Sequence, residues 1–288
     1  MNAAIIGLGS MGKKHYKTLK LFDFVDVYTV DKYLEDSNFR SVEQLLKNID
    51  IDFAIIATPT FTHSEVALNL LNHGVHVLIE KPVFAKHTEV NKIIDAMEKN
   101  DCKVAVGHVE RYNPAFQALM KDLKNQKILN CNITRISPRP IRTTDVGVKL
   151  DLAIHDVDLI RLITKQEILN YSSVSTCSKG ENEDTVSYFV SLDNGATATI
   201  LASWRSPLRK RTMEILTDES FYEVDLLNQT ITKHIPNNNI SHIIEKPNIK
   251  REDALKNQLN EFIEYVNIGK IGRLATLKDA IAALKLVE

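Results

Sequence analysis

The chain has 288 residues, 44% of them hydrophobic and 25% charged, which is ordinary for a globular protein able to bury a core without disulfides or metal ions. Its 36 basic and 37 acidic side chains leave a formal net charge of −1, which argues against an electrostatic footprint for nucleic acid or an anionic membrane. Three scattered cysteines indicate no disulfide framework or zinc spacing. With no basic leader and no apolar run near the roughly 20 residues of a membrane span, we expect a cytoplasmic protein.

Short apolar runs alternate with helical patterns over residues 1–120. The predicted strands are 2–6, 25–30, 52–58, 75–79 and 103–107, and the predicted helices include 10–22 and 86–99. Ser41 to Gln44 forms a capping box, Thr62 to Glu65 caps the next helix, and Gly74 stands where a left-handed residue ends that helix. The alternation predicts an α/β domain of βαβ units on a doubly wound parallel sheet, a Rossmann domain.

The pattern changes over residues 121–288, where strand-like runs follow one another. The predicted strands are 128–137, 172–178, 185–192, 196–203, 212–216, 221–226 and 230–234. The predicted helices are 149–163, 252–268 and 277–287, and 138–145 is a predicted loop. Asp193-Asn-Gly195 is a hairpin signal between two of the strands. This half predicts an α+β domain with a mainly antiparallel open sheet, expected to bind substrate and to mediate oligomers.

A glycine-rich motif follows the first predicted strand and begins a helix. It reads Gly7-Leu8-Gly9-Ser10-Met11-Gly12, a pattern in which glycines permit a tight turn and close approach of the backbone to a pyrophosphate. Asp31 ends the second predicted strand, where a carboxylate accepts bonds from the adenosine ribose. NAD is therefore favoured over NADP, although Lys32 leaves some NADP use open. The alternative is a glycine-rich turn of another α/β protein.

Two further strand ends carry polar residues at the edge of the sheet where ligands bind in such folds. The third junction supplies candidate cofactor contacts, namely Thr58, Pro59, Thr60 and His63. A proline turn and a helix cap would also account for this segment. Glu80 and Lys81 follow the fourth strand and are further cofactor candidates, and Lys81 would stabilise negative charge on a reacting oxygen. The alternative for Lys81 is a salt bridge to Glu80.

Asp151 and His155 are four residues apart in a predicted helix, which puts them on one face. A carboxylate beside an imidazole fixes its tautomer, so His155 would act as the base that removes a hydroxyl proton while hydride leaves the carbon. The alternatives are a satisfied core histidine or a pair of zinc ligands, although no further metal ligands can be located. Asp156 and Asp158 are expected to face solvent or to cap neighbouring structure.

The glycine motif, Glu80-Lys81-Pro82 and Asp151-x-x-x-His155 occur in an order that resembles the Gfo/Idh/MocA oxidoreductases over nearly the full length. The resemblance implies that Lys81, Asp151 and His155 are the catalytic set of a sugar or polyol dehydrogenase. It also implies that the open sheet face forms dimers or tetramers.

Three stretches resemble the branch of this family that oxidises the 3-hydroxyl of UDP-N-acetylglucosamine or related nucleotide sugars. They are residues 107–114, 145–151 and 203–211. In that branch Arg111, Tyr112 and Asn113 would contact substrate, and Arg209, Lys210 and Arg211 would neutralise a diphosphate, although such a charge run is also typical of a solvated surface.

Two other functions remain open. One is a dehydrogenase of a free polyol or sugar such as inositol or glucose. The other is a non-catalytic NAD-binding regulator of the same fold, which would be expected to lack at least one of Lys81, Asp151 and His155. A DNA-binding regulator would also carry a basic recognition helix, and none stands out in the sequence.

Overall fold

The computed structural model describes residues 1–84, 89–140, 146–178, 182–238 and 241–288. The chain divides into two compact units. The first unit comprises Met1–Val109 and Leu255–Lys285, and the second comprises Glu110–Ala254 and Leu286–Glu288. Among the described residues, no helix is both long enough and apolar enough to cross a membrane.

The C-terminal helices account for the difference between these units and the expected domains. The predicted second domain includes all residues from 121 onward, whereas α7 (Ala254–Ile268) and most of α8 (Leu277–Val287) belong to the first unit. The ring of Phe262 on α7 meets that of Phe53 edge-on, with centroids 5.6 Å apart. Leu277 and Ala280 on α8 lie in the apolar core of the first unit. Apolar helix faces show that a helix packs, but not which sheet it packs on.

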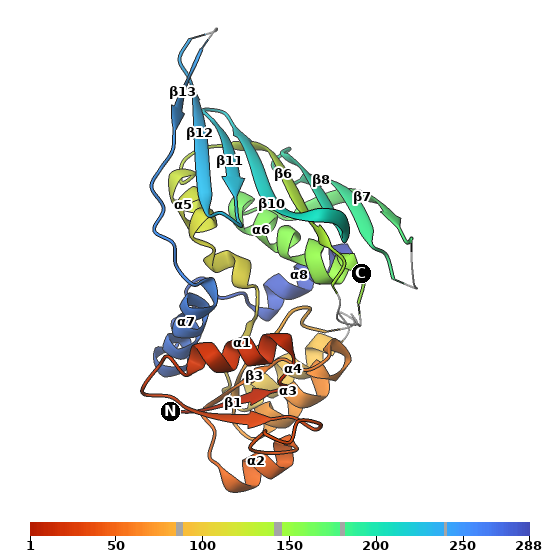
Figure 1. The fold of residues 1–288 in the computed structure, drawn as a ribbon, viewed down its shortest axis with the longest axis vertical. Coiled ribbons are helices and arrows are strands. Elements are labelled where there is room, and N and C mark those ends of the chain that lie inside the picture. The colour runs from red at the N-terminus through yellow and green to blue at the C-terminus, as the bar shows by residue number, and fades with distance from the viewer. Residues whose placement is uncertain (85–88, 141–145, 179–181, 239–240) are drawn as a thin grey trace. The chain divides into compact units, whose positions relative to one another are not determined.

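A five-stranded parallel sheet forms the centre of the first unit, in the order β2-β1-β3-β4-β5. Two of its strands, β1 and β3, are labelled in Figure 1. Its strands are β1 (Asn2–Ile6), β2 (Asp26–Val30), β3 (Phe53–Ile56), β4 (His76–Ile79) and β5 (Val104–Val106). The connecting helices are α1 (Ser10–Leu19), α2 (Val42–Asn48), α3 (His63–Asn72) and α4 (Val90–Lys99). Every residue of β3 is buried, as expected for a central strand covered on both faces. The predicted Rossmann sheet is confirmed, and β1 lies beside β3 where the strand order reverses.

The predicted helix ends hold only in part. Ser41 Oγ accepts the Gln44 amide at 3.2 Å, but the Gln44 side chain bonds to the amide of Arg40 instead of that of Ser41. Thr62 stands at the N-cap position of α3, but its side chain makes no cap hydrogen bond. Its hydroxyl oxygen lies instead 2.7 Å from the Pro59 carbonyl oxygen and 2.7 Å from the Thr58 hydroxyl oxygen. Gly74 adopts the expected left-handed conformation, with φ of +76°.

An eight-stranded sheet forms the centre of the second unit, in the order β13-β12-β11-β10-β6-β9-β8-β7. Its strands are β6 (Ile128–Pro138), β7 (Ile168–Thr176), β8 (Thr185–Leu192), β9 (Thr197–Ser203), β10 (Arg205–Thr217), β11 (Phe221–Asp225), β12 (Thr230–Pro236) and β13 (His242–Glu245). Among the described pairings of this sheet, β6–β9 is parallel and the other six are antiparallel, so the predicted mainly antiparallel sheet is confirmed. Helices α5 (Pro114–Asp122) and α6 (Ile154–Thr164) pack against it (Figure 1).

Several elements of the second unit differ from their predictions. β10 begins at Arg205 because its charged first half pairs with β6 across a register shift. β13 and α5 were not predicted, and every residue of the four-residue β13 is exposed, so it has no apolar alternation. The predicted helix 149–163 begins with a π-helical turn, Lys149–Ala153, before α6. Residues 86–88 of one predicted helix and 141–145 of one predicted loop lie outside the described residues.

Candidate functional site

The glycine motif connects β1 to α1, as the sequence predicts. Gly7 has φ of +91°, and a Cβ there would lie 2.9 Å from the Ala57 carbonyl oxygen. A Cβ on Gly12 would collide with the Gly7 carbonyl oxygen. Gly9, at the helix N-terminus, differs, since a Cβ there would meet nothing within 4 Å. The fold itself requires Gly7 and Gly12, whereas the open space at Gly9 fits a pyrophosphate that approaches the free amides of α1.

Asp31 follows β2 directly and bonds to the glycine loop. Its Oδ2 accepts the Leu8 amide at 2.8 Å, and its Oδ1 accepts the amides of Tyr33 and Leu34 at 2.9 and 3.1 Å. Burial raises the pKa of this carboxyl, but the three backbone amides outweigh it and hold the pKa below its ordinary value. A carboxylate offers about four lone-pair sites, so the charged Asp31 retains one for a ribose hydroxyl. The sequence did not predict that Asp31 also accepts the Leu8 amide of the glycine loop.

The third junction contacts the segment around Lys81 through His63. His63 is buried, and its Nε2 lies 2.9 Å from the Thr58 carbonyl oxygen. Its Nδ1 lies 3.1 Å from the carbonyl oxygen of Pro82 and 3.2 Å from that of Val83. The imidazole predicted to contact the cofactor thus directs both nitrogens to backbone carbonyl groups. The cofactor roles of Thr58, Pro59, Thr60 and His63 stay predictions.

Glu80 and Lys81 follow β4, and their side chains differ in environment. The Glu80 carboxylate is buried and lies 2.6 Å from Nε2 of His15, a residue of α1 that the sequence analysis did not single out. Its other oxygen accepts the Lys81 amide at 3.2 Å. Burial raises the pKa of Glu80, but the bond to His15 and the charge of Lys81 bring it below the ordinary value. Lys81 itself is half-buried, and its catalytic role stays a prediction.

Asp151 and His155 lie in the second unit on two kinds of helical turn. Asp151 is in the π-helical turn and is half-buried, whereas His155 is buried in the first turn of α6. The Ile154 amide bonds to the Lys149 carbonyl, five residues back, so the spacing of an ordinary α-helix does not apply between the two side chains. Such π-turns occur frequently at functional sites. Among the described residues no group of three or more His, Cys, Asp or Glu is arranged to hold a metal ion.

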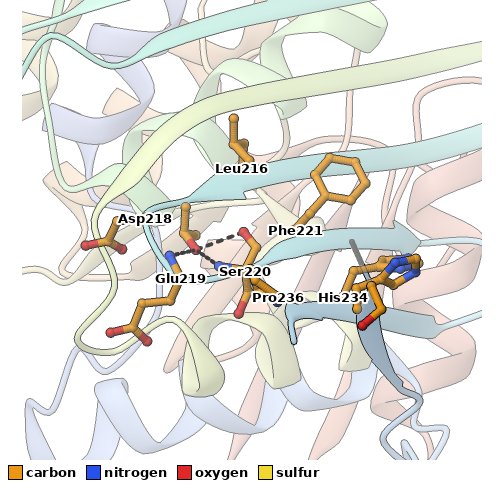
Figure 2. A pocket seen from close by; sticks show the side chains of 10 residues that line it. Leu216, Asp218, Glu219, Ser220, Phe221, His234 and Pro236 are labelled. Carbon is orange, nitrogen blue, oxygen red and sulfur yellow. Dashed lines mark hydrogen bonds between the residues drawn. The ribbon is translucent and has the colours of Figure 1, made fainter. Parts of the chain in front are cut away.

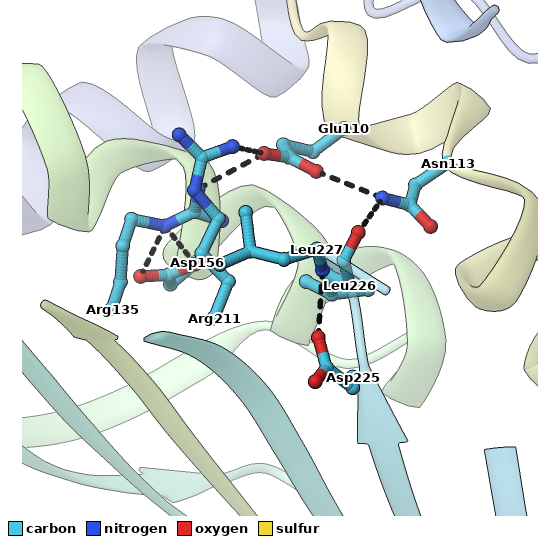
Figure 3. A network of polar contacts seen from close by, with 8 residues as sticks. All are labelled: Glu110, Asn113, Arg135, Asp156, Arg211, Asp225, Leu226 and Leu227. Carbon is cyan, nitrogen blue, oxygen red and sulfur yellow. Dashed lines mark hydrogen bonds and ion pairs between the residues drawn. The ribbon is translucent and has the colours of Figure 1, made fainter. Parts of the chain in front are cut away.

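Asp156 and Asp158 are both buried, so the expectation that they face solvent is wrong. Arg135 on β6 contacts Asp156 through Nε and Nη2, at 2.8 and 2.7 Å from Oδ1, and contacts Glu110 at 3.0 Å (Figure 3). Arg211 on β10 adds a second guanidinium, 2.7 Å from the same Glu110 oxygen. Burial lowers the pKa of Arg135, but Asp156 and Glu110 outweigh it and raise the pKa above the ordinary value. These two acidic and two basic side chains form one buried cluster, which includes Asp156, the residue that follows His155 in α6.

The predicted substrate residues Arg111, Tyr112 and Asn113 are all buried within the second unit. Arg111 donates from Nε and Nη2 to Asp158, at 2.8 and 2.6 Å. The Asn113 side chain accepts the Ala115 amide at the start of α5 and donates to the Leu226 carbonyl at 2.8 Å. These contacts account for the burial of Arg111 and Asn113 without any ligand. The substrate-binding roles of the three residues stay predictions.

The rest of the predicted charge run divides into two environments. Arg209 and Lys210 are exposed on β10, whereas Arg211 bonds to Glu110. The entry to the π-turn is fixed at Gly147, where a Cβ would collide with the Glu183 carboxylate. The same carboxylate accepts the Lys149 amide at 3.1 Å. Asp145, in the family-like stretch before it, lies outside the described residues.

A hollow of about 330 Å³ lies elsewhere in the second unit (Figure 2). It is lined by the turn between β10 and β11, the end of β12 and the start of β13. Thr217 closes that turn through its hydroxyl, which bonds to the Ser220 carbonyl. None of the predicted site residues is among its lining residues, so the hollow is separate from the predicted site.

Comparison with known proteins follows the same division of the chain. A family model described as an oxidoreductase family with an NAD-binding Rossmann fold matches residues 1–108, and a GFO/IDH/MocA C-terminal domain model matches residues 128–223. The UDP-N-acetylglucosamine 3-dehydrogenase of Acidithiobacillus ferrooxidans is 30% identical over 92% of this chain and 88% of that protein. The scyllo-inositol 2-dehydrogenase (NAD(+)) of Bacillus subtilis is 24% identical over 94% of this chain and 87% of that protein.

A solved structure of the Acidithiobacillus ferrooxidans enzyme, GnnA, superposes with a TM-score of 0.91 and 25% identity, covering 100% of this chain and 95% of that one. The matches confirm the expectations of an NAD-dependent dehydrogenase and of a likeness to the nucleotide-sugar branch. The chain belongs to the Gfo/Idh/MocA oxidoreductases.

Proposed function

We propose that this oxidoreductase transfers a hydride to NAD from carbon 3 of a UDP-N-acetylhexosamine-type nucleotide sugar. The observation that carries the proposal is the similarity, over nearly the full length, to the UDP-N-acetylglucosamine 3-dehydrogenase of Acidithiobacillus ferrooxidans. The fit of the glycine loop supports the cofactor half, because the open space at Gly9 and the charged Asp31 suit the pyrophosphate and ribose of NAD.

His155 is the proposed general base. Its imidazole accepts the proton of the sugar hydroxyl while the carbon–hydrogen bond breaks, so the alcohol becomes a ketone. Asp151 orients the imidazole and stabilises its protonated form. Lys81 donates a hydrogen bond to the hydroxyl oxygen and stabilises the negative charge that develops there. Bound NAD would supply the acceptor for the hydride that leaves this carbon.

A nucleotide-sugar substrate carries a negatively charged diphosphate, so its binding site should offer cationic side chains. Arg209 and Lys210 are exposed cations on β10, and they belong to the same unit as His155. Arg211 is committed to Glu110, although its side chain is 40% exposed. We therefore assign the diphosphate to Arg209 and Lys210 rather than to Arg211. A polyol without phosphate would not need these cations.

A dehydrogenase of a free polyol is the second candidate. It is favoured by the similarity to the scyllo-inositol 2-dehydrogenase of Bacillus subtilis, which also spans nearly the whole chain at lower identity. The two candidates share the hydride transfer and differ in what surrounds the reacting carbon. A non-catalytic NAD-binding protein is the third outcome to test.

Reduction of NAD by the purified protein with UDP-N-acetylglucosamine tests the function. An aminotransferase that consumes the ketone keeps the equilibrium from hiding turnover, and free glucose and scyllo-inositol are assayed in parallel. Turnover with the nucleotide sugar that is lost in His155→Ala supports the proposal. Turnover with only a free polyol keeps the mechanism and replaces the substrate. Binding of NADH, detected by fluorescence, without oxidation of any of these alcohols would favour the regulator.

We also propose that the protein assembles through the open face of the eight-stranded sheet. Phe189 on β8 is 61% exposed, and it pairs in register with Thr199 on β9, two residues from the exposed Leu201. Alternating residues share a face, so these apolar side chains lie opposite the buried side of both strands. Sedimentation should show a dimer or tetramer that Phe189→Asp dissociates. A wild-type monomer would exclude this assembly.

A further inference from the structure

Two buried histidines contact the residues on either side of Lys81. His15, from α1, bonds to the Glu80 carboxylate at 2.6 Å. His63, from α3, lies 3.1 Å from the Pro82 carbonyl oxygen. The relative exposures of His15 and His63 are 0% and 1%, so both contacts are shielded from water.

The Glu80 carboxylate is enclosed from several directions. His15 approaches one oxygen, the Lys81 amide donates to the other, and a Cβ on Gly107 would lie 3.0 Å from both. An ionised carboxylate only accepts, so Nε2 of His15 is the donor. The net contribution of such a bond to stability is small, because each partner gives up a bond to water when it is buried. An apolar side chain could fill the same space, so packing alone does not require an imidazole at position 15.

His63 holds the segment that follows Lys81. Its Nδ1 faces the carbonyl oxygens of Pro82 and Val83, and its Nε2 faces that of Thr58. Each of these carbonyl oxygens is an acceptor, so whichever ring nitrogen carries the proton donates to the carbonyl group that it faces. The third junction and the segment after β4 are therefore connected through one side chain.

We propose that His15 and His63 form a histidine clamp that positions Lys81 for the reaction. The inference rests on the proposed function, in which Lys81 donates to the reacting oxygen. His15 fixes Glu80, whose second oxygen holds the Lys81 amide, and His63 fixes the two carbonyl groups that follow. Neither imidazole needs to touch substrate, and both are positioning residues. A displacement of about 1 Å at a catalytic group is enough to slow a reaction about a hundredfold.

Four variants and one control test the clamp. His15→Leu removes the donor, His15→Gln restores an amide nitrogen near the place of Nε2, and His15→Asn has an amide too short to reach Glu80. His63→Leu removes the other side of the clamp. The control, His76→Gln, alters a half-buried imidazole at the opposite end of β4, where Nδ1 accepts the Lys103 amide.

The primary measurement is the ¹³C-dimethyl NMR resonance of Lys81 after reductive methylation, assigned through Lys81→Arg. We expect His15→Leu, His15→Asn and His63→Leu to move this resonance and to lower kcat about tenfold or more, with KM for NAD within about threefold. His15→Gln should restore both, and His76→Gln should change neither.

Several outcomes would overturn the clamp. One is a Lys81 resonance that stays in place in His15→Leu or His63→Leu, and another is a His15→Gln variant that behaves like His15→Leu. If His15→Leu does not fold, the comparison of His15→Gln with His15→Asn tests the clamp, and equal Lys81 resonances in these two variants would overturn it. Because the resonance needs no turnover, a wild-type protein that oxidises no alcohol would contradict the proposed function and leave the clamp testable.

Discussion

Each unit places a proposed catalytic side chain next to a buried carboxylate, but the two carboxylates are held differently. In the first unit Glu80 precedes Lys81 and contacts one imidazole, that of His15. In the second unit Asp156 follows His155 and contacts Arg135, which also bonds to Glu110 and so connects to Arg211. The first carboxylate has one side-chain partner, an imidazole, whereas the second belongs to a cluster of four ionisable side chains.

The difference indicates two ways of fixing a reactive group. A guanidinium stays charged at any ordinary pH and forms several bonds in a fixed plane, so it holds α6 rigidly at the cost of desolvating four ions. An imidazole forms one bond at a time on each nitrogen and is less costly to bury. We therefore expect loss of Arg135 to be a stability defect, and loss of His15 to be mainly a defect of catalysis.

The largest expected effect is on the chemical step itself. His155→Asn should lower kcat for the productive alcohol by about 10² to 10⁴-fold, the usual contribution of a general base. Its Kd for NADH, measured by fluorescence titration, should stay within about twofold, because the proposed cofactor residues belong to the first unit. A variant with full kcat would remove His155 from the mechanism.

The next largest effect distinguishes the two supports. Arg135→Met breaks the buried cluster and should reduce the free energy of unfolding by about 3 to 5 kcal/mol, because Asp156 and Glu110 lose their shared partner. His15→Leu should cost about 1 to 3 kcal/mol. Lys250→Met, which removes an exposed partner of Glu252 at 3.4 Å, is the control and should cost less than about 1 kcal/mol. Urea unfolding measures all three, and equal losses for Arg135→Met and His15→Leu would contradict the comparison.

A smaller effect is expected on the pH dependence of the free energy of unfolding below pH 7. The pKa values of Glu80 and Glu110 both lie below the ordinary value of 4.5, despite burial that raises them, because of His15 in one case and Arg135 and Arg211 in the other. A lowered pKa stabilises the folded state fully above 4.5, and this contribution disappears as the pH falls through the folded pKa. Between about pH 7 and pH 3, the free energy of unfolding should therefore depend less steeply on pH in Glu80→Gln and Glu110→Gln than in the wild type. Curves parallel to the wild type would contradict the shifts.

Much of the fold could be predicted because its signals are local. The continuous apolar run of β3 and the Asp193-Asn-Gly195 turn each depend on a few adjacent residues, and both formed as expected. The packing of α7 on the first unit could not be predicted, because an apolar helix face does not specify its partner. The exposed strand β13 has no apolar alternation and is defined only by its pairing with β12.

The residues of the candidate site also fall into those that local sequence spacing predicts and those that depend on distant partners. Gly9 and Asp31 could be identified because their chemistry depends on spacing along a βαβ unit. His15, Glu110 and Arg135 could not, because each acquires its role from a partner far along the chain, such as Glu80, 65 residues after His15. The burial of Asp156 was missed for the same reason. Its partner Arg135 lies on another element, so the charge pattern around Asp156 resembles that of a solvated helix.

The smallest effect on stability is expected at Gly9, in the glycine loop where the cofactor is proposed to bind. A Cβ at Gly9 meets nothing within 4 Å, so Gly9→Ala should change the free energy of unfolding by only about 0.5 kcal/mol. The same Cβ would occupy the space through which a pyrophosphate reaches the amides of α1, so Kd for NADH should rise about tenfold, or about 1.4 kcal/mol. Gly12→Ala is the contrast, since its Cβ collides with the Gly7 carbonyl oxygen and should destabilise the apoprotein. If Gly9→Ala bound NADH as tightly as the wild type, the α1 N-terminus would not hold the pyrophosphate. Gly9 precedes α1, the helix that carries His15, but its added Cβ would meet no other atom and should not move His15. The Lys81 resonance should therefore stay unchanged in Gly9→Ala, which would separate binding of the cofactor from positioning of Lys81.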